Sequence, residues 1–216
     1  MSDMLDRQVK IPAKANRKIE MKAIPGHFAT NHSHINYYLN MTPIKCRHTE
    51  AQMAAKEFVK KYKHTTAVGT IVCMDGCEVI GAYLAEELTA AGIMSLNSHE
   101  CVNVITPEIN TGGQIIFREN VEAMLMNKHV VLVLASATTG QTIQQSIQAI
   151  RYYGGIVEGV SAIFAAVDEV DGVTVDSIYH VDDIKDYQNY SLGECPYCKA
   201  GNKLDAIVNS YGYSKI

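Results

Sequence analysis

Residues 129–150 constrain the fold of this chain more than any other stretch. Their first part, Val130 to Leu134, is an unbroken run of β-branched and aliphatic residues. It is too short for a buried helix and predicts a parallel strand that is covered on both faces. Ser136 to Thr142 is small and hydroxylated, and apolar residues then recur at helical spacing at Ile143, Ile147 and Ile150. We therefore predict a strand, a tight loop and a helix, in this order.

The loop of this unit is a candidate anion site. Free N–H groups and the macrodipole at a helix N-terminus attract a phosphate, and threonine hydroxyls add hydrogen-bond donors. Gly140 would let the backbone come close to a ligand. An ordinary turn between a strand and a helix, capped by Thr or Ser, is the alternative that these residues leave open.

Further strands and helices alternate along the chain. Thr49 to Tyr62 carries an apolar stripe at helical spacing, with its first residue as the expected cap. Ala67 to Met74 predicts a buried strand, and after the loop Asp75 to Glu78 a helix is expected from Val79 to Ala91. Ile156 to Val167 predicts another buried strand. This alternation predicts an α/β fold with a mostly parallel sheet, in which ligands bind at the carboxyl ends of the strands.

The composition bears on partners and on location. A chain of 216 residues can bury a sizeable core, and its net charge of -4 argues against nucleic acid or an acidic membrane surface as a partner. The sequence has no cleavable signal and no apolar run of the 18 or so residues that a membrane span needs. We therefore expect a cytoplasmic protein whose six cysteines are reduced.

Changes in composition divide the chain into three segments. Residues 1–22 carry six Lys or Arg and are expected to form an arm that is loosely held or docks on a partner subunit. Residues 23–190 are expected to form the main domain. Residues 191–216 form a different tail, which contains the sequence Cys195-Pro196-Tyr197-Cys198.

Cysteines and histidines raise the question of a metal. One Cys-x-x-Cys is half of a zinc site, and the other four cysteines supply no second pair. Zinc at Cys195 and Cys198 is therefore an alternative to a surface turn. His27, His32 and His34 are close in sequence, but a metal there needs a Cys or carboxylate partner, and none is near. We expect these histidines to make hydrogen bonds within the loop or to a flat ligand.

Val130 to Thr142 resembles the phosphoribosylpyrophosphate (PRPP) motif of type I phosphoribosyltransferases. The half Thr138-Thr139-Gly140-Gln141-Thr142 matches, whereas Ala135 and Ser136 stand where the motif has two acidic residues. Thr30 to Tyr38 resembles the substrate loop of orotate phosphoribosyltransferases, and Val72 to Leu84 is similar to their second strand and pyrophosphate loop. The resemblance covers residues 24–202, with the motifs in the family's order.

This resemblance implies a fold and an activity. The fold would be a central, mostly parallel sheet flanked by helices, with a small N-terminal hood region. The protein would transfer ribose 5-phosphate from PRPP to a nucleobase, with an orotate-like pyrimidine favoured, and would release pyrophosphate with Mg2+ as cofactor. A homodimer is implied as well. The missing acidic pair favours the alternative, a non-catalytic protein of this fold that binds PRPP or a nucleotide as a sensor or regulator.

The resemblance also implies roles for individual residues. The implied contacts to PRPP are Ser136, Ala137, Thr138, Thr139, Gly140, Gln141 and Thr142, with Asp75, Gly76 and Cys77 against the pyrophosphate. The implied catalytic residues are Arg118 and Asp75, and residues 106–118 would form a mobile lid. The implied contacts to the base are Ser33, His34, Asn36 and Tyr37.

Overall fold

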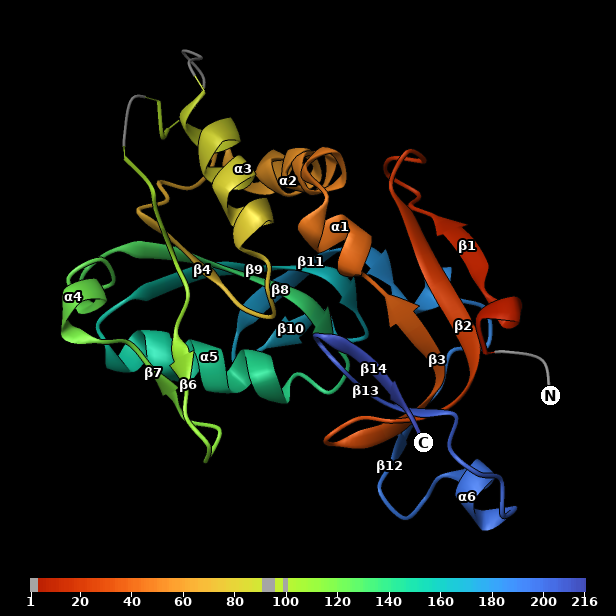
Figure 1. The fold of residues 1–216 in the computed structure, drawn as a ribbon. Coiled ribbons are helices and arrows are strands. Elements are labelled where there is room, and N and C mark those ends of the chain that lie inside the picture. The colour runs from red at the N-terminus through yellow and green to blue at the C-terminus, as the bar shows by residue number, and fades with distance from the viewer. Residues whose placement is uncertain (1–3, 91–95, 99–100) are drawn as a thin grey trace.

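The computed structural model describes residues 4–90, 96–98 and 101–216, which form two six-stranded sheets and one two-stranded sheet. The larger part of the molecule is built on a core sheet with the strand order β10-β11-β9-β8-β4-β5 (Figure 1). Its strands are β4 (Thr70–Cys73), β5 (Asn103–Ile105), β8 (His129–Ala137), β9 (Ile156–Ala165), β10 (Glu169–Val170) and β11 (Val173–His180). Only β10 is antiparallel to its neighbour. The predicted mostly parallel sheet is confirmed.

Strand β8 lies at the centre of this sheet and is buried on both faces, as its unbroken apolar run predicts. Val131, Val133 and Ala135 point to one face, where they pack in the same apolar cluster as α2 (His48–Tyr62) and α3 (Glu78–Thr89). Val130, Leu132 and Leu134 point to the other face, against α5 (Gln141–Tyr152). Figure 1 shows α2 and α3 on one side of the sheet and α5 on the other.

A second sheet, the hood sheet, has the strand order β12-β3-β2-β13-β14, with β1 paired to β2. Its strands are β1 (Val9–Pro12), β2 (Glu20–Ala29), β3 (Ser33–Asn40), β12 (Asn189–Ser191), β13 (Ala206–Asn209) and β14 (Gly212–Lys215). The hood is therefore not only N-terminal, because β12, β13 and β14 come from the end of the chain. The predicted arm and the predicted tail both supply strands to it. Phe28 of β2 pairs with Ala206 of β13 in a parallel register, and no local sequence pattern predicts this pairing.

Short elements complete the fold. They are η1 (Met4–Arg7), α1 (Thr42–Cys46), β6 (Glu108–Ile109), β7 (Ile115–Ile116), α4 (Glu119–Glu122), η2 (Val181–Asp183) and α6 (Pro196–Lys199). Strands β6 and β7 pair as a separate hairpin between β5 and α4. None of the helices in the described part of the chain combines the length and the apolar character that a membrane crossing requires.

Two predicted helix ends differ from the structure. Helix α2 begins at His48 with Arg47 at the N-cap position, and Thr49, the expected cap, lies in the first turn and donates its hydroxyl hydrogen bond to Glu50 instead. The helix expected from Val79 to Ala91 is described from Glu78 to Thr89. Its predicted end at Ala91 lies outside the described residues.

Gly81 brings α3 very close to the core sheet, and its substitution should cost stability. A Cβ at Gly81 would lie 2.3 Å from Cys73 Sγ and 3.1 Å from Val104 Cγ1. We expect Gly81→Ala to lower the free energy of unfolding by about 1–3 kcal/mol, although alanine is the better helix former. Chemical denaturation of the purified chain measures this change.

The double variant tests the cause. Cys73→Ala removes the sulfur that the new methyl group would meet, so Gly81→Ala should cost less in that background, with a coupling of about 0.5–3 kcal/mol. Equal costs in both backgrounds would show that the contact between α3 and β4 is not the reason.

Candidate functional site

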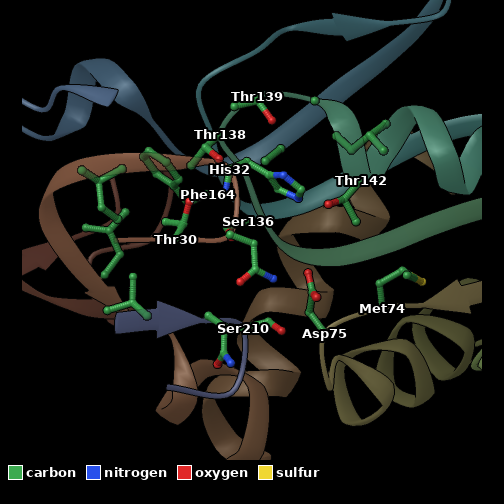
Figure 2. Close-up of a pocket in the computed structure, with 18 of the residues that line it drawn as sticks. Thr30, His32, Met74, Asp75, Ser136, Thr138, Thr139, Thr142, Phe164 and Ser210 are labelled. Carbon is green, nitrogen blue, oxygen red and sulfur yellow. Dashed lines mark hydrogen bonds between the residues drawn. The ribbon is translucent and has the colours of Figure 1, made fainter. Parts of the chain in front are cut away.

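A cavity of about 320 Å³ lies between the core sheet and the hood sheet. Its core side is made by the loops that follow β4 and β8, at the carboxyl ends of neighbouring parallel strands. Its other walls come from β3, from the turn between β2 and β3, and from the turn between β13 and β14. Figure 2 shows the loop with Thr138, Thr139 and Thr142 across the cavity from Asp75 and Ser210. The predicted position of the site, at the ends of the strands, thus coincides with a cavity.

The loop from β8 to α5 presents small and hydroxylated residues to this cavity. Six of its seven predicted ligand contacts line the wall, namely Ser136, Ala137, Thr138, Thr139, Gly140 and Thr142. Gln141 is exposed and is not among the described lining residues. Gly140 is the N-cap of α5 in the left-handed region at φ 76°, and no side chain caps the helix there. The first N–H groups of α5 can therefore donate to an anion in the cavity.

Asp75 supplies a carboxylate beside the place where the acidic pair of the motif is missing. It follows β4 in a tight turn with positive φ angles, 59° at Asp75 and 76° at Gly76. Burial raises the pKa of Asp75, and the side chain of Ser210, the backbone of Ala135 and nearby Lys45 act against this shift. Figure 2 shows its side chain directed into the cavity.

Lys45 holds the Asp75 turn against the C-terminal hairpin. Its side chain is buried, and Nζ donates hydrogen bonds of 2.6 Å to the carbonyl oxygens of Asp75 and Ser210. Two segments that are far apart in the sequence thus meet at one ammonium group. Sequence reasoning missed both Lys45 and Ser210. Only the position of a lysine between Ile44 and Cys46 could have drawn attention to Lys45, and that signal is weak.

Gly76 and Cys77 complete the turn that follows β4. Neither is among the described residues that line the cavity. Cys77 is fully buried in the apolar cluster below α3, and burial raises the pKa of its thiol well above the ordinary value. The structure gives Cys77 a packing environment, and the predicted contact of these two residues with pyrophosphate stays a prediction.

The hood side of the cavity is formed by neighbours of the predicted base contacts. Thr30, Asn31 and His32 lie in the turn between β2 and β3 and line the cavity, as do the β3 residues Ile35, Tyr38 and Leu39. The hydroxyl oxygen of Thr30 accepts hydrogen bonds from the backbone N–H groups of His32 and Ser33, and these bonds stabilise the turn. Sequence reasoning had placed the contacts at other positions of the same segment.

The four predicted base contacts point elsewhere in the hood. Ser33 is buried, and its hydroxyl shares a hydrogen bond with the hydroxyl of Thr30. His34 Nδ1 lies 3.1 Å from His27 Nε2. Asn36 and Tyr37 line a second hollow in the hood, where the Asn36 side-chain amide donates a hydrogen bond to the carbonyl oxygen of Asp186. None of the four is among the described residues that line the main cavity. Their contact with a base therefore stays a prediction.

The β6–β7 hairpin reaches the cavity as the predicted lid would. Ile109, Gly113 and Ile115 from this hairpin contribute to the cavity wall. Arg118, the predicted catalytic cation, pairs with Glu108 through two hydrogen bonds of 2.8 Å at the base of the hairpin. Both side chains are largely exposed, and Arg118 is not among the described lining residues. Its predicted role stays a prediction.

The walls of the cavity differ in polarity. The core side carries hydroxyls, backbone N–H groups and the Asp75 carboxylate, whereas the hood side is mainly apolar with the polar turn at Thr30 to His32. No lysine or arginine lines the cavity within residues 4–90, 96–98 and 101–216. Such an arrangement can hold a phosphate at the helix N-terminus, a hydroxyl-bearing group at the carboxylate and a flat apolar group under the hood.

Solved structures with a similar fold include phosphoribosyltransferases. Orotate phosphoribosyltransferase from Mycobacterium tuberculosis H37Rv, in complex with Fe(III) dicitrate, matches with a TM-score of 0.50 and 13% identity over 81% of this chain and 89% of that chain. Adenine phosphoribosyltransferase from Thermoanaerobacter pseudethanolicus matches with a TM-score of 0.50 and 15% identity over 82% and 97% of the two chains. The corresponding enzyme from Rhodothermus marinus matches with a TM-score of 0.50 and 12% identity over 82% and 96%.

These similarities confirm the predicted type I phosphoribosyltransferase-like fold. No protein-family model and no curated protein sequence matches the chain. Because the identities are this low, the similarity concerns the fold, and activity has to be argued from the site.

The raised pKa of Asp75 leads to a test by pH. The carboxyl holds its proton more tightly in the folded than in the unfolded chain, so stability falls as pH rises from the ordinary value of 3.8 through the raised value. Asn at this position is close to Asp in size and cannot ionise. We expect Asp75→Asn to be more stable than the wild type at about pH 7, with an advantage that shrinks toward pH 3.8.

Urea denaturation across this range measures the effect. The matched control is Asp168→Asn, because the Asp168 side chain is 88% exposed and its ion pair with His180 should contribute no more than about 1 kcal/mol. An advantage of Asp75→Asn that is the same at all pH values would contradict the burial argument.

Proposed function

We propose that this protein is a phosphoribosyltransferase that transfers ribose 5-phosphate from PRPP to a nucleobase and releases pyrophosphate. The observation that carries the proposal is the position of Asp75, which lines the same cavity as the 136–142 loop. A carboxylate is thereby present next to the anion-binding loop, although Ala135 and Ser136 replace the acidic pair of the motif.

The 5′-phosphate is assigned to the N-terminus of α5. The N–H groups of the 138–142 loop would donate to its oxygens, and the hydroxyls of Thr138, Thr139 and Thr142 would add further bonds. This part of the proposal needs no lysine or arginine, because the helix macrodipole and the N–H groups supply the positive potential.

The ribose is assigned to Asp75. Hydrogen bonds from sugar hydroxyls to a carboxylate are charge-assisted and contribute about 1.5–3 kcal/mol each. One carboxylate in place of two leaves the developing positive charge on the ribose with less stabilisation than the complete motif would give. Ser136 and Ser210 add neutral hydroxyls on the same wall.

Mg2+ is the cofactor that this reaction class implies, and the donor set suits it. Mg2+ is commonly held by one or two carboxylates together with substrate phosphates and water. Asp75 is the carboxylate that would hold it, with the pyrophosphate of PRPP supplying the other oxygens. The ion would neutralise charge on the pyrophosphate as it leaves.

The base is assigned to the space under the hood, with an orotate-like pyrimidine favoured. Thr30, Asn31 and His32 offer a hydroxyl, an amide and an imidazole to the polar edge of a base, and Tyr38 and Phe164 offer flat apolar surface. The β6–β7 hairpin would exclude water from the reacting ribose. Arg118 can turn toward pyrophosphate at little cost, because its exposed pair with Glu108 contributes only about 0–1 kcal/mol.

A second function is favoured by a specific observation. Ala135 and Ser136 lack the acidic pair, and no cation lines the cavity within the described residues. These features fit a non-catalytic protein that binds PRPP or a nucleotide as a sensor or regulator. In both cases the ligand would occupy the same loop and the same carboxylate.

The deciding experiment is pyrophosphate release from PRPP with Mg2+ and a panel of orotate, uracil and the common purine bases. Release that depends on one base would support the transferase and identify its substrate. Titration calorimetry with PRPP on the same preparation separates the alternatives. Binding without release from any base would favour the sensor, and no binding would contradict both proposals.

The hydroxyl of Thr139 should contribute to this binding. Thr139→Val keeps the shape of the side chain and removes a hydrogen bond to a charged phosphate, which is worth about 1.5–3 kcal/mol. We expect the Kd for PRPP to rise by roughly tenfold to a hundredfold. Thr174→Val is the matched control, because Thr174 is exposed on β11 and does not line the cavity. Equal affinities for the two variants would show that the loop is only a turn.

Two further expectations rest on the resemblance and the composition alone. We propose a homodimer, which sedimentation velocity on the purified chain can test. The cytoplasmic location expected from the reduced cysteines stays a prediction.

A further inference from the structure

Two histidines and two cysteines from distant parts of the chain meet at the outer end of the hood. His27 lies on β2 and His34 on β3, whereas Cys195 is the N-cap residue of α6 and Cys198 lies within that helix. One ligand atom from each residue lies within 4.8 Å of the others. None of the four is among the described residues that line the main cavity. The Cys-x-x-Cys half-site thus has a second pair, which comes from the β2–β3 hairpin.

The separations within the cluster match a tetrahedron around zinc. With Zn–S bonds of about 2.3 Å and Zn–N bonds of about 2.0–2.1 Å, tetrahedral ligands are about 3.3 Å apart for N and N and about 3.6 Å apart for N and S. His27 Nε2 lies 3.1 Å from His34 Nδ1. Cys195 Sγ and Cys198 Sγ lie 3.4 and 3.6 Å from His27 Nε2, and Cys198 Sγ lies 3.3 Å from His34 Nδ1.

The surroundings orient His27 for such a role. Its other ring nitrogen, Nδ1, lies 3.3 Å from the carbonyl oxygen of Lys203, which can fix the tautomer that leaves the Nε2 lone pair free. Tyr197, between the two cysteines, stacks on the imidazole with ring centroids 5.2 Å apart. His27 and Cys195 are both buried, so their polar atoms depend on partners within the cluster.

We propose that His27, His34, Cys195 and Cys198 form a structural zinc site of the Cys2His2 type. Two imidazoles and two thiolates are a common ligand set for structural zinc. All four coordination positions are filled by the protein, so the site is closed and has no position for a substrate. The sequence contains no second cysteine pair for the CxxC, and the structure brings His27 and His34 to it from more than 150 residues earlier in the chain.

The site would fasten the tail to the hood. Helix α6 has only four residues and lies between β12 and β13, at the outer end of the hood sheet (Figure 1). A zinc ion would bond this short helix to β2 and β3 at once. The same segment leads into β13, and the turn after β13 carries Ser210 to the cavity. Zinc is therefore expected to stabilise the fold of the tail and, through it, one wall of the cavity.

Metal content of the purified full chain tests the proposal. We expect one zinc per chain by elemental mass spectrometry after expression with zinc and purification in a reducing buffer. Cys198→Ser and His34→Gln should lose most of this zinc on dialysis. The matched controls are Cys46→Ser and His48→Gln, because both residues are exposed and neither belongs to the cluster; these variants should keep one zinc.

Cobalt provides an independent readout that requires no activity. The chain stripped of metal and loaded with Co2+ should show the absorption bands of tetrahedral cobalt with thiolate ligands, and Cys198→Ser should change them. Chelation should lower the melting temperature of the wild type and leave that of zinc-free Cys198→Ser unchanged. A folded chain that binds neither metal, zinc that persists in both ligand variants, or a Cys195–Cys198 disulfide in the reduced preparation would each overturn the proposal.

Discussion

The burial of β8 on both faces is the constraint on which the rest of the structure depends. Because Val130 to Leu134 are covered by α2 and α3 on one side and by α5 on the other, the strand must lie at the centre of a parallel sheet. Parallel neighbours then end at the same edge, which brings the turn after β4 and the loop after β8 together. The Asp75 carboxylate and the N-terminus of α5 face one cavity for this reason.

Features that depend on local patterns could be predicted from the sequence. The apolar run of β8, the helical spacing of α5 and the stripe of α2 fix which residues are buried, so the core sheet and the loop at residues 136–142 follow from them. The family motif points to the same loop. Local patterns are less exact at the ends of elements, as the displaced cap of α2 shows.

Features that depend on contacts between distant residues could not be predicted. The hood sheet joins β2 to β13, and no periodicity reveals a parallel pair formed by opposite ends of the chain. The hydrogen bond from Lys45 to Ser210 and the contact of the CxxC with His27 likewise join residues that are far apart in the sequence. The hood wall also differs from the expected contacts, because Ile35, Tyr38 and Leu39 of β3 line the cavity in place of the predicted positions.

The shared hood sheet makes the order of synthesis matter for the ligand site. All strands of the core sheet precede residue 181, whereas Ser210 and the hairpin around it follow them in the sequence and are made later. A nascent chain can therefore complete its core sheet while one wall of the cavity has yet to leave the ribosome. A ligand that needs this wall can stabilise the fold only after the segment around Ser210 has been made, since until then the core folds by its own packing.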